Sequence, residues 1–97
     1  MSTFAEYLRE DYRLVILRLL VEQTAYRANS SVLTMALDSY GHTLSRDQVK
    51  TELNWLAEQG ALTLEDIGAV VVTTLTERGQ DIATGRARVP GIKRPGA

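Results

Sequence analysis

The stretch that decides the fold is residues 44–79, "LSRDQVKTELNWLAEQGALTLEDIGAVVVTTLTERG". Ser45 and Gln48 have the spacing of a capping box, in which the two side chains satisfy free backbone N–H groups at a helix start. Gly60 follows the last apolar residue of the pattern and is the residue type that most often ends a helix. We therefore expect a helix between Ser45 and Gly60, with one apolar face formed by Val49, Leu53 and Leu56.

The second half of the stretch has the pattern of a β-hairpin. The runs "ALTLE" and "AVVVTTL" flank the turn "DIG", and the second run is rich in the β-branched residues that favour strands. After the hairpin, Thr76 can cap a last helix that continues to about Ala83 and ends at Gly85. The remaining "RARVPGIKRPGA" contains Pro and Gly and is expected to be irregular.

A long helix is expected at the start of the chain. Thr3 and Glu6 have the T-x-x-E spacing of a helix start, and no Gly or Pro interrupts the chain from there to Gln23. The apolar residues of this segment are too many for one stripe, so the helix needs burial on two sides. One side can face the domain core. The other is a candidate seam of a homodimer, formed by Tyr7, Leu14, Leu17 and Val21; the alternative is that the chain itself covers both sides.

A second helix is expected between the polar segment "RANSS" and Gly41. It starts near Ser30 and directs inward the side chains of Val32, Leu33, Ala36, Leu37 and Tyr40. Because only the short turn "GHTL" separates it from the helix after Ser45, the two form a helix-turn-helix pattern. The predicted fold class is mainly α with a small β-hairpin, in the order helix-helix-helix-strand-strand-helix, with one domain at 1–85 and a basic tail at 86–97.

Composition limits the classes of function. The 97 residues, 44% of them hydrophobic, suit one domain, and the chain has no Cys. The absence of Cys fits a reducing, cytoplasmic setting. The start of the chain lacks the pattern of a secretory signal. The most apolar run, "LVILRLLV", contains Arg18 and is shorter than the roughly 20 residues that span a bilayer. We expect a cytoplasmic protein without a membrane segment.

Catalysis, metal binding and cofactor binding are not expected. The single His42 lies in a predicted loop, and neither a G-x-S-x-G nor a G-x-x-x-x-G-K-[ST] pattern is present. One His without Cys does not supply the nitrogen and sulfur ligands of a typical transition-metal site. The expected site therefore contains no catalytic residue and no metal ligand, and the protein is not expected to be an enzyme.

The charges are unevenly distributed along the chain. Residues 1–81 hold all 12 acidic residues and 7 of the 11 basic ones, a net charge of −5, whereas residues 82–97 carry a net charge of +4. This basic tail can be an arm that contacts the DNA backbone, or a solvated terminus. Val89 and Ile92 favour docking of the tail on the domain or on a neighbour, because they are apolar.

The order of elements, together with "LSRDQVKTELNWLAEQGALT" and "VVVTTLTERGQDIA", resembles winged-helix regulators of the ArsR and MarR type over roughly residues 5–84. With the tail "GRARVPGIKRPG" included, the chain resembles small winged-helix proteins of Mu-like phages and prophages. The resemblance implies double-stranded DNA as a partner, with the third helix in the major groove. The expected DNA-binding residues are Ser45, Arg46, Lys50, Thr51 and Asn54 of that helix and Arg86, Arg88, Lys93 and Arg94 of the tail.

The hairpin departs from the MarR pattern. A MarR-type wing typically carries an Asp-x-Arg element, whereas this hairpin reads "EDIGA", and no basic residue lies between Lys50 and Arg78. Acidic side chains at Glu65 and Asp66 repel phosphate, so the wing is not expected to hold DNA as a MarR wing does. The alternative function is an adaptor that binds a phage or host protein. Trp55 then forms part of the contact surface, unless its ring packs beneath the hairpin.

Overall fold

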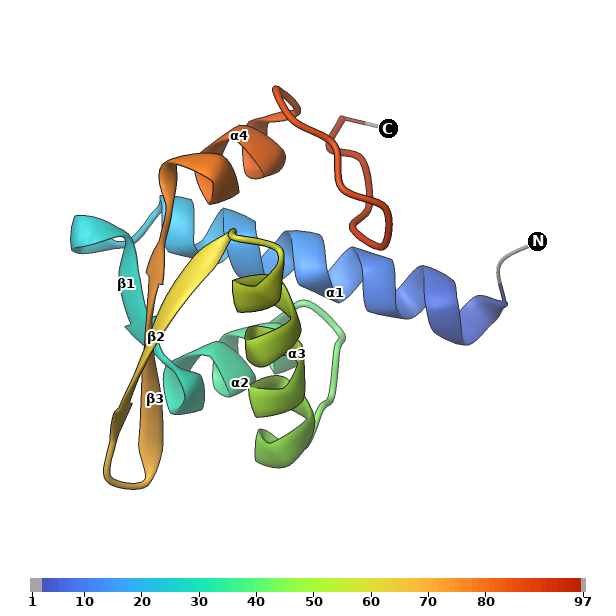
Figure 1. Cartoon of the computed structure of the whole chain (residues 1–97). Coiled ribbons are helices and arrows are strands. Elements are labelled where there is room, and N and C mark those ends of the chain that lie inside the picture. Colours follow the sequence, from blue (N-terminus) through green and yellow to red (C-terminus); the bar gives the residue numbers. More distant parts are fainter. Residues whose placement is uncertain (1–2, 97) are drawn as a thin grey trace.

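The computed structural model describes residues 3–96, and in that range four helices pack beside one antiparallel sheet (Figure 1). Met1, Ser2 and Ala97, which fall within the predicted domain and tail, lie outside the described residues. The helices are α1 (Phe4–Val21), α2 (Ser30–Ser39), α3 (Arg46–Glu58) and α4 (Glu77–Thr84), with a short 3₁₀ turn at Thr24–Tyr26. The strands are β1 (Arg27–Asn29), β2 (Leu62–Ile67) and β3 (Val70–Leu75).

The helix starts predicted from side-chain spacing are confirmed. The Thr3 hydroxyl accepts a hydrogen bond from the backbone N–H of Glu6, and the Thr76 hydroxyl accepts one from Gly79. At the start of α3 both arms of the capping box form: Gln48 N–H donates to the Ser45 hydroxyl at 3.0 Å, and Ser45 N–H donates to the Gln48 side chain at 2.9 Å. These bonds satisfy backbone donors that the first turn of a helix leaves without partners.

The sheet contains one strand that the sequence analysis missed. The segment "RANSS" was expected to be a polar break, but its first three residues form β1, which pairs with β3 to give the strand order β1-β3-β2. The Thr73 hydroxyl donates to the Ala28 carbonyl at 2.9 Å, and the Val71 N–H donates to the Ser30 hydroxyl at 3.0 Å. A three-residue strand is too short to show alternation, so only its partner strand reveals it.

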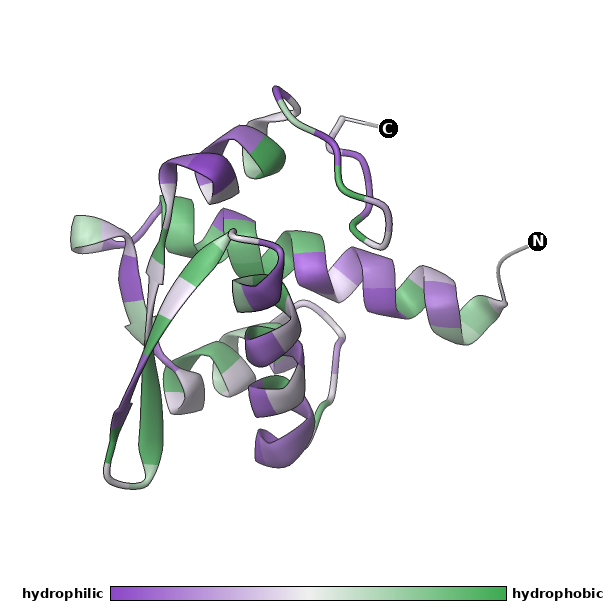
Figure 2. Ribbon diagram, viewed as in Figure 1, coloured by the Kyte–Doolittle hydropathy of each residue, from purple (hydrophilic) through white to green (hydrophobic). Residues whose placement is uncertain are grey.

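The core lies around the C-terminal half of α1, which packs against α2, α4 and the sheet. Figure 2 shows hydrophobic residues on the part of α1 that the other elements surround and a more hydrophilic mixture on its projecting end. The largest fully buried side chains include Leu14, Ile16, Leu17, Leu20, Leu33, Leu37, Leu53, Leu56 and Ile82. The prediction for α2 was wrong at Val32 and Tyr40, which are 49% and 60% exposed. Tyr40 is the C-cap residue of α2, so its side chain no longer follows the periodicity that directs the helical side chains inward.

The C-terminal segment is packed against α1 and is neither a mobile arm nor a fully solvated terminus. Val89 and Ile92 are only 7% and 9% exposed and belong to the hydrophobic core. The Lys93 N–H donates to the Glu10 carbonyl at 3.1 Å. The docking that the apolar residues of the tail suggested is therefore present on the same chain. Its cause is ordinary burial of apolar surface, which removes these two side chains from water.

Gly79, within α4, allows a close approach between α4 and the connection from α3 to β2. A Cβ atom at this position would overlap the Ala61 carbonyl oxygen and would lie 2.5 Å from Leu75 Cδ1. Replacement of a helical glycine by alanine normally stabilises a helix by up to ~1 kcal/mol. Here we expect Gly79→Ala to have the opposite sign and to lower the free energy of unfolding by about 1–3 kcal/mol through overpacking. Urea denaturation checks this, and a stabilised variant would contradict the packing.

Candidate nucleic-acid interface

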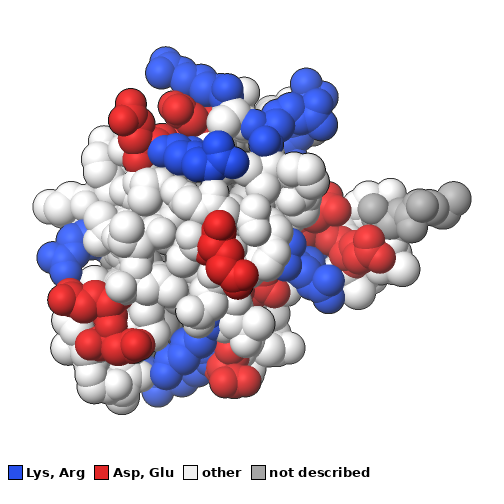
Figure 3. Space-filling model, in the orientation of Figure 1, with Lys and Arg blue, Asp and Glu red and all other residues white. Residues whose placement is uncertain are grey.

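The exposed face of α3 carries both signs of charge. Arg46, Asp47, Thr51, Asn54 and Glu58 are exposed, and Lys50 is half-buried. The structure therefore places the predicted α3 residues on an accessible surface, together with two acids that cancel the charge of Arg46 and Lys50. Figure 3 shows the same mixture on a larger scale, with Lys and Arg interspersed with Asp and Glu over the face in view. Such a surface gives a weaker attraction for phosphates than a continuous basic patch.

Several α3 side chains are engaged within the chain. The Thr51 hydroxyl donates to the Asp47 carbonyl at 3.1 Å, and the Asn54 amide donates to the Lys50 carbonyl at 2.9 Å. The Ser45 hydroxyl caps the helix, so its role is structural. Thr51 and Asn54 have to leave these local bonds before they can contact a base edge, which reduces the net gain from such a contact.

Lys50 connects α3 to the turn of the hairpin. Its ammonium donates to the Ala69 carbonyl at 3.4 Å, and Arg46 lies one helical turn before it. The N-terminal half of α3 and the turn between β2 and β3 thus lie at the same end of the molecule, the lower end in Figure 1. This end presents two basic side chains from a helix beside an exposed hairpin, which is the arrangement a phosphate backbone can contact.

The two acidic residues of the hairpin point to opposite faces of the sheet. In the β2–β3 register, Asp66 pairs with Val71, on the face that Leu62 and Leu64 direct toward the helices. Glu65 pairs with Val72 on the other face, where its carboxylate lies 4.0 Å from the Arg27 guanidinium. Because strand side chains alternate, only Asp66 is on the α3 side of the hairpin. The predicted repulsion of phosphate applies to Asp66, and Glu65 has a cation beside it.

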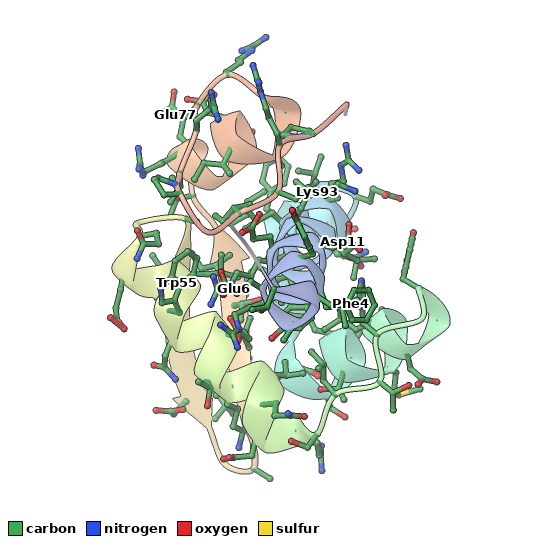
Figure 4. The ribbon with its side chains drawn as sticks, turned by 90° about the vertical axis from the view of Figure 1, so that its right-hand side faces the viewer. Phe4, Glu6, Asp11, Trp55, Glu77 and Lys93 are labelled. Carbon is green, nitrogen blue, oxygen red and sulfur yellow. The ribbon has the colours of Figure 1, made fainter. Side chains whose placement is uncertain are left out.

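The four basic residues of the tail differ in their environments. Arg86, Arg88 and Arg94 are exposed, whereas the Lys93 ammonium lies 3.2 Å from Asp11, which also contacts His42 at 2.7 Å. Desolvation by burial raises the pKa of Asp11, but the hydrogen bonds from His42 and Lys93 together outweigh it, so the net pKa is lowered. Asp11 therefore neutralises one of the tail cations (Figure 4).

A buried polar cluster joins α1, α3 and the C-terminal segment. The Arg13 guanidinium donates from Nε to Glu52 at 2.7 Å and from Nη1 to the Gly91 carbonyl at 3.0 Å, and it stacks 3.7 Å from the Trp55 ring centroid. The Tyr12 hydroxyl also donates to Glu52 at 3.0 Å. Burial, followed by the hydrogen bond to the Glu52 carboxylate, raises the pKa of Tyr12. Trp55 packs against Arg13 in this cluster. The prediction that its ring packs beneath the hairpin is therefore wrong.

The predicted dimer seam needs correction at two residues. Leu14 and Leu17 are 2% and 0% exposed in the single chain, because they pack in its own core. They have no surface to offer to a second copy. Val21 is half-buried and packs against the core, while Tyr7 is 58% exposed. The alternative, that the chain itself covers this face, is correct for the part of α1 that contains Leu14 and Leu17.

Residues 3–96 contain no group of three or more His, Cys, Asp or Glu side chains that could hold a metal ion. No helix in the same range is long and apolar enough to cross a membrane.

Comparison with known proteins places the chain in a phage-related group. No family model matches the chain. An uncharacterised protein of Escherichia phage Mu, gp26, is 53% identical to it over 90 residues, which is 93% of each chain. An uncharacterised protein of Haemophilus influenzae is 43% identical over 94 residues, which is 91% of each chain. At these identities over nearly the whole length, the chain belongs to the family of small phage-related proteins that includes gp26 of phage Mu.

Proposed function

We propose that this chain is a winged-helix protein that binds double-stranded DNA in the cytoplasm of the host, in gene regulation or an auxiliary DNA transaction of a Mu-like phage or prophage. The helix-turn-helix of α2 and α3, followed by the β2–β3 hairpin, supports this assignment. α3 serves as the recognition helix, and the hairpin serves as the wing. The proposed role is binding and not catalysis.

The observation that carries the proposal is the position of Arg46 and Lys50. Both lie in the N-terminal half of α3, and Lys50 contacts the turn of the hairpin through the Ala69 carbonyl. In helix-turn-helix proteins the N-terminal residues of the recognition helix contact base edges, and flanking cations contact phosphates. Asp47 and Glu58 on the same helix keep the affinity modest. With two cations per chain, the slope of log affinity against log salt is expected to be about −2.

The tail is a second, separable source of phosphate contacts. The tail packs near Trp55, whereas Arg46 lies nine residues before Trp55, or roughly 13 Å away along the helix axis. The cations of the tail and those of α3 can therefore be changed separately. Because the segment is docked, its exposed cations Arg86, Arg88 and Arg94 can contact DNA only from a fixed position. Neutralisation of these cations is therefore a cleaner test than deletion of the tail.

Fluorescence anisotropy with mixed-sequence duplex DNA at low and moderate salt tests the proposal. The pair Arg46→Gln and Lys50→Gln is expected to reduce affinity at low salt about tenfold or more, because it removes the two phosphate contacts of α3. The matched pair Arg86→Gln and Arg88→Gln is expected to reduce it less. A loss confined to the tail pair would move DNA binding from α3 to the C-terminal segment. Absence of binding by the unmodified protein at low salt would reject the proposal.

The two acids of the hairpin provide an internal control in the same assay. Asp66→Lys is expected to strengthen binding, since it replaces a repulsive charge on the α3 side of the wing. Glu65→Lys makes the same change in charge on the opposite face and is expected to have little effect. Equal effects would mean that only the net charge of the protein matters.

A second candidate function is a non-DNA-binding adaptor for a phage or host protein. The acidic hairpin and the absence of net charge on the exposed face of α3 favour it. It predicts that none of the variants above changes an affinity that is already negligible at low salt.

A further inference from the structure

The C-terminal segment forms a loop between α4 and α1, with Lys93 next to Asp11 of α1 (Figure 4). Within the loop the Ile92 N–H donates to the Val89 carbonyl at 3.2 Å and closes a tight turn. Pro90 is the second residue of this turn, and Gly91, with a φ of +98°, is the third. Proline followed by a residue of positive φ is typical of a type II turn. The turn reverses the chain, so residues before and after it border the same hollow.

This hollow has a volume of about 230 Å³ and lies between the loop, α1 and α4. Its apolar lining includes Ile82, Val89 and Ile92, all of which are buried. Pockets for drug-sized ligands typically have volumes of roughly 300–1,000 Å³. The hollow is smaller than these pockets, so it suits a compact chemical group.

The charged part of the lining is mainly cationic. Arg88, Lys93 and Arg94 border the hollow, and among the described residues Glu10 is its only acid. The Lys93 ammonium already has a partner, because it lies 3.2 Å from Asp11. Arg88 and Arg94, in contrast, form no ion pair with any residue between 3 and 96. Two guanidinium groups are thus available beside an apolar floor, where water screens their charge less than in open solvent.

The backbone of the loop supplies further donors. In the described part of the chain no backbone carbonyl accepts a hydrogen bond from four N–H groups of the lining, those of Arg88, Val89, Gly91 and Arg94. Val89 is buried, and the N–H of a buried residue normally has a partner, which can be a bound molecule. The loop therefore gathers N–H donors of two kinds around one small volume.

From this arrangement we propose that the hollow binds a phosphate group. Arg88 precedes the turn and Arg94 follows it, so their guanidinium groups come from different arms of the loop. A tetrahedral phosphate accepts hydrogen bonds on several oxygens at once, and a guanidinium group pairs with it through two parallel bonds. Backbone N–H groups that converge in a turn also bind anions. Arg88 and Arg94 are the main contacts, and Lys93 contributes less because Asp11 neutralises it.

The position of the hollow separates it from the proposed recognition helix. Figure 1 shows the C-terminal segment at the upper end of the molecule, and the N-terminal half of α3 with the turn of the hairpin at the lower end. Phosphate binding by the loop therefore does not require DNA on α3. The phosphate can belong to a free anion or to a nucleic-acid backbone, since both present the same oxygens to the loop.

Titration of the full chain with inorganic phosphate at constant ionic strength tests the proposal, with the backbone amide signals followed by NMR. The four amides of the lining are expected to shift and to saturate. Arg88→Gln is expected to raise the dissociation constant for phosphate about fivefold or more, because it removes a charged donor. Arg86→Gln is the matched control: Arg86 is also exposed and lies two residues away, but it does not line the hollow. Its dissociation constant should equal that of the unmodified protein.

A second titration, with a short DNA duplex, distinguishes the two sources of phosphate. If the duplex shifts the same amides and inorganic phosphate competes with it, the loop binds a nucleic-acid backbone. If phosphate saturates these amides and the duplex leaves them unchanged, the loop binds a free anion. Amide shifts that do not saturate would overturn the proposal, and so would equal shifts with chloride or equal effects of Arg86→Gln and Arg88→Gln. None of these outcomes depends on whether α3 binds DNA.

Discussion

Replacement of the two buried residues of the C-terminal segment is expected to destabilise the whole domain. Val89→Ala and Ile92→Ala together should lower the free energy of unfolding by about 3–5 kcal/mol, because each change removes buried methyl groups and leaves a cavity against the core. This is a large part of the roughly 5–15 kcal/mol that stabilises a typical domain. Urea denaturation at a fixed protein concentration measures it.

The matched control for this prediction changes charge in the same segment without touching the core. Arg86 and Arg88 are exposed, and their replacement by Gln is expected to alter stability by less than about 0.5 kcal/mol. If the double alanine variant has the stability of the unmodified protein, then the segment is not docked in solution, and the interpretation as a mobile DNA-contacting arm regains support. If the prediction holds, deletion of residues 86–97 perturbs the fold and is unsuitable as a test of DNA binding.

The local part of this fold follows from the sequence because its causes are local. The starts of α1, α3 and α4 depend on hydroxyl groups three residues from the N–H groups that they satisfy. The hairpin depends on β-branched residues around a short turn. Spacing alone therefore predicts these elements, and α3 with its exposed Arg46 was correctly placed on the surface.

The features that were missed depend on contacts between distant parts of the chain. β1 exists because β3 offers it an edge, and Arg27 lies 47 positions before its partner Thr74. Glu52 was not considered, because nothing near it in sequence distinguishes it from a solvated acid. Only its distance of 2.7 Å from Arg13, which is 39 residues away, shows that it is buried and paired.

The acidic hairpin illustrates a further limit. When the hairpin sequence is compared with DNA-binding wings, the acidic residues Glu65 and Asp66 argue against phosphate contact. In the structure they also belong to β2, an edge strand of the sheet. Charged side chains on an edge strand discourage pairing with other chains. The same residues therefore have a protective role that is independent of DNA, and their charge alone does not decide between the two proposed functions.

Arg13→Met is expected to lower the free energy of unfolding by about 3–5 kcal/mol, the effect of removing one partner of a buried ion pair. The side chains of Arg13 and Glu52 are only 11% and 10% exposed. Without the guanidinium, the Glu52 carboxylate keeps only the Tyr12 hydroxyl as a partner. The Gly91 carbonyl loses its donor and Trp55 loses the stacked cation. One substitution thus weakens the contacts of α1 with both α3 and the C-terminal segment.

The double variant Arg13→Met with Glu52→Met separates the loss of the pair from the loss of packing. Apolar residues of similar size often replace a buried ion pair at little cost, so the double variant is expected to recover most of the stability that Arg13→Met loses. A double variant as unstable as Arg13→Met would show that the contacts to Trp55 and Gly91, and not the ion pair, hold α3 and the C-terminal segment against α1.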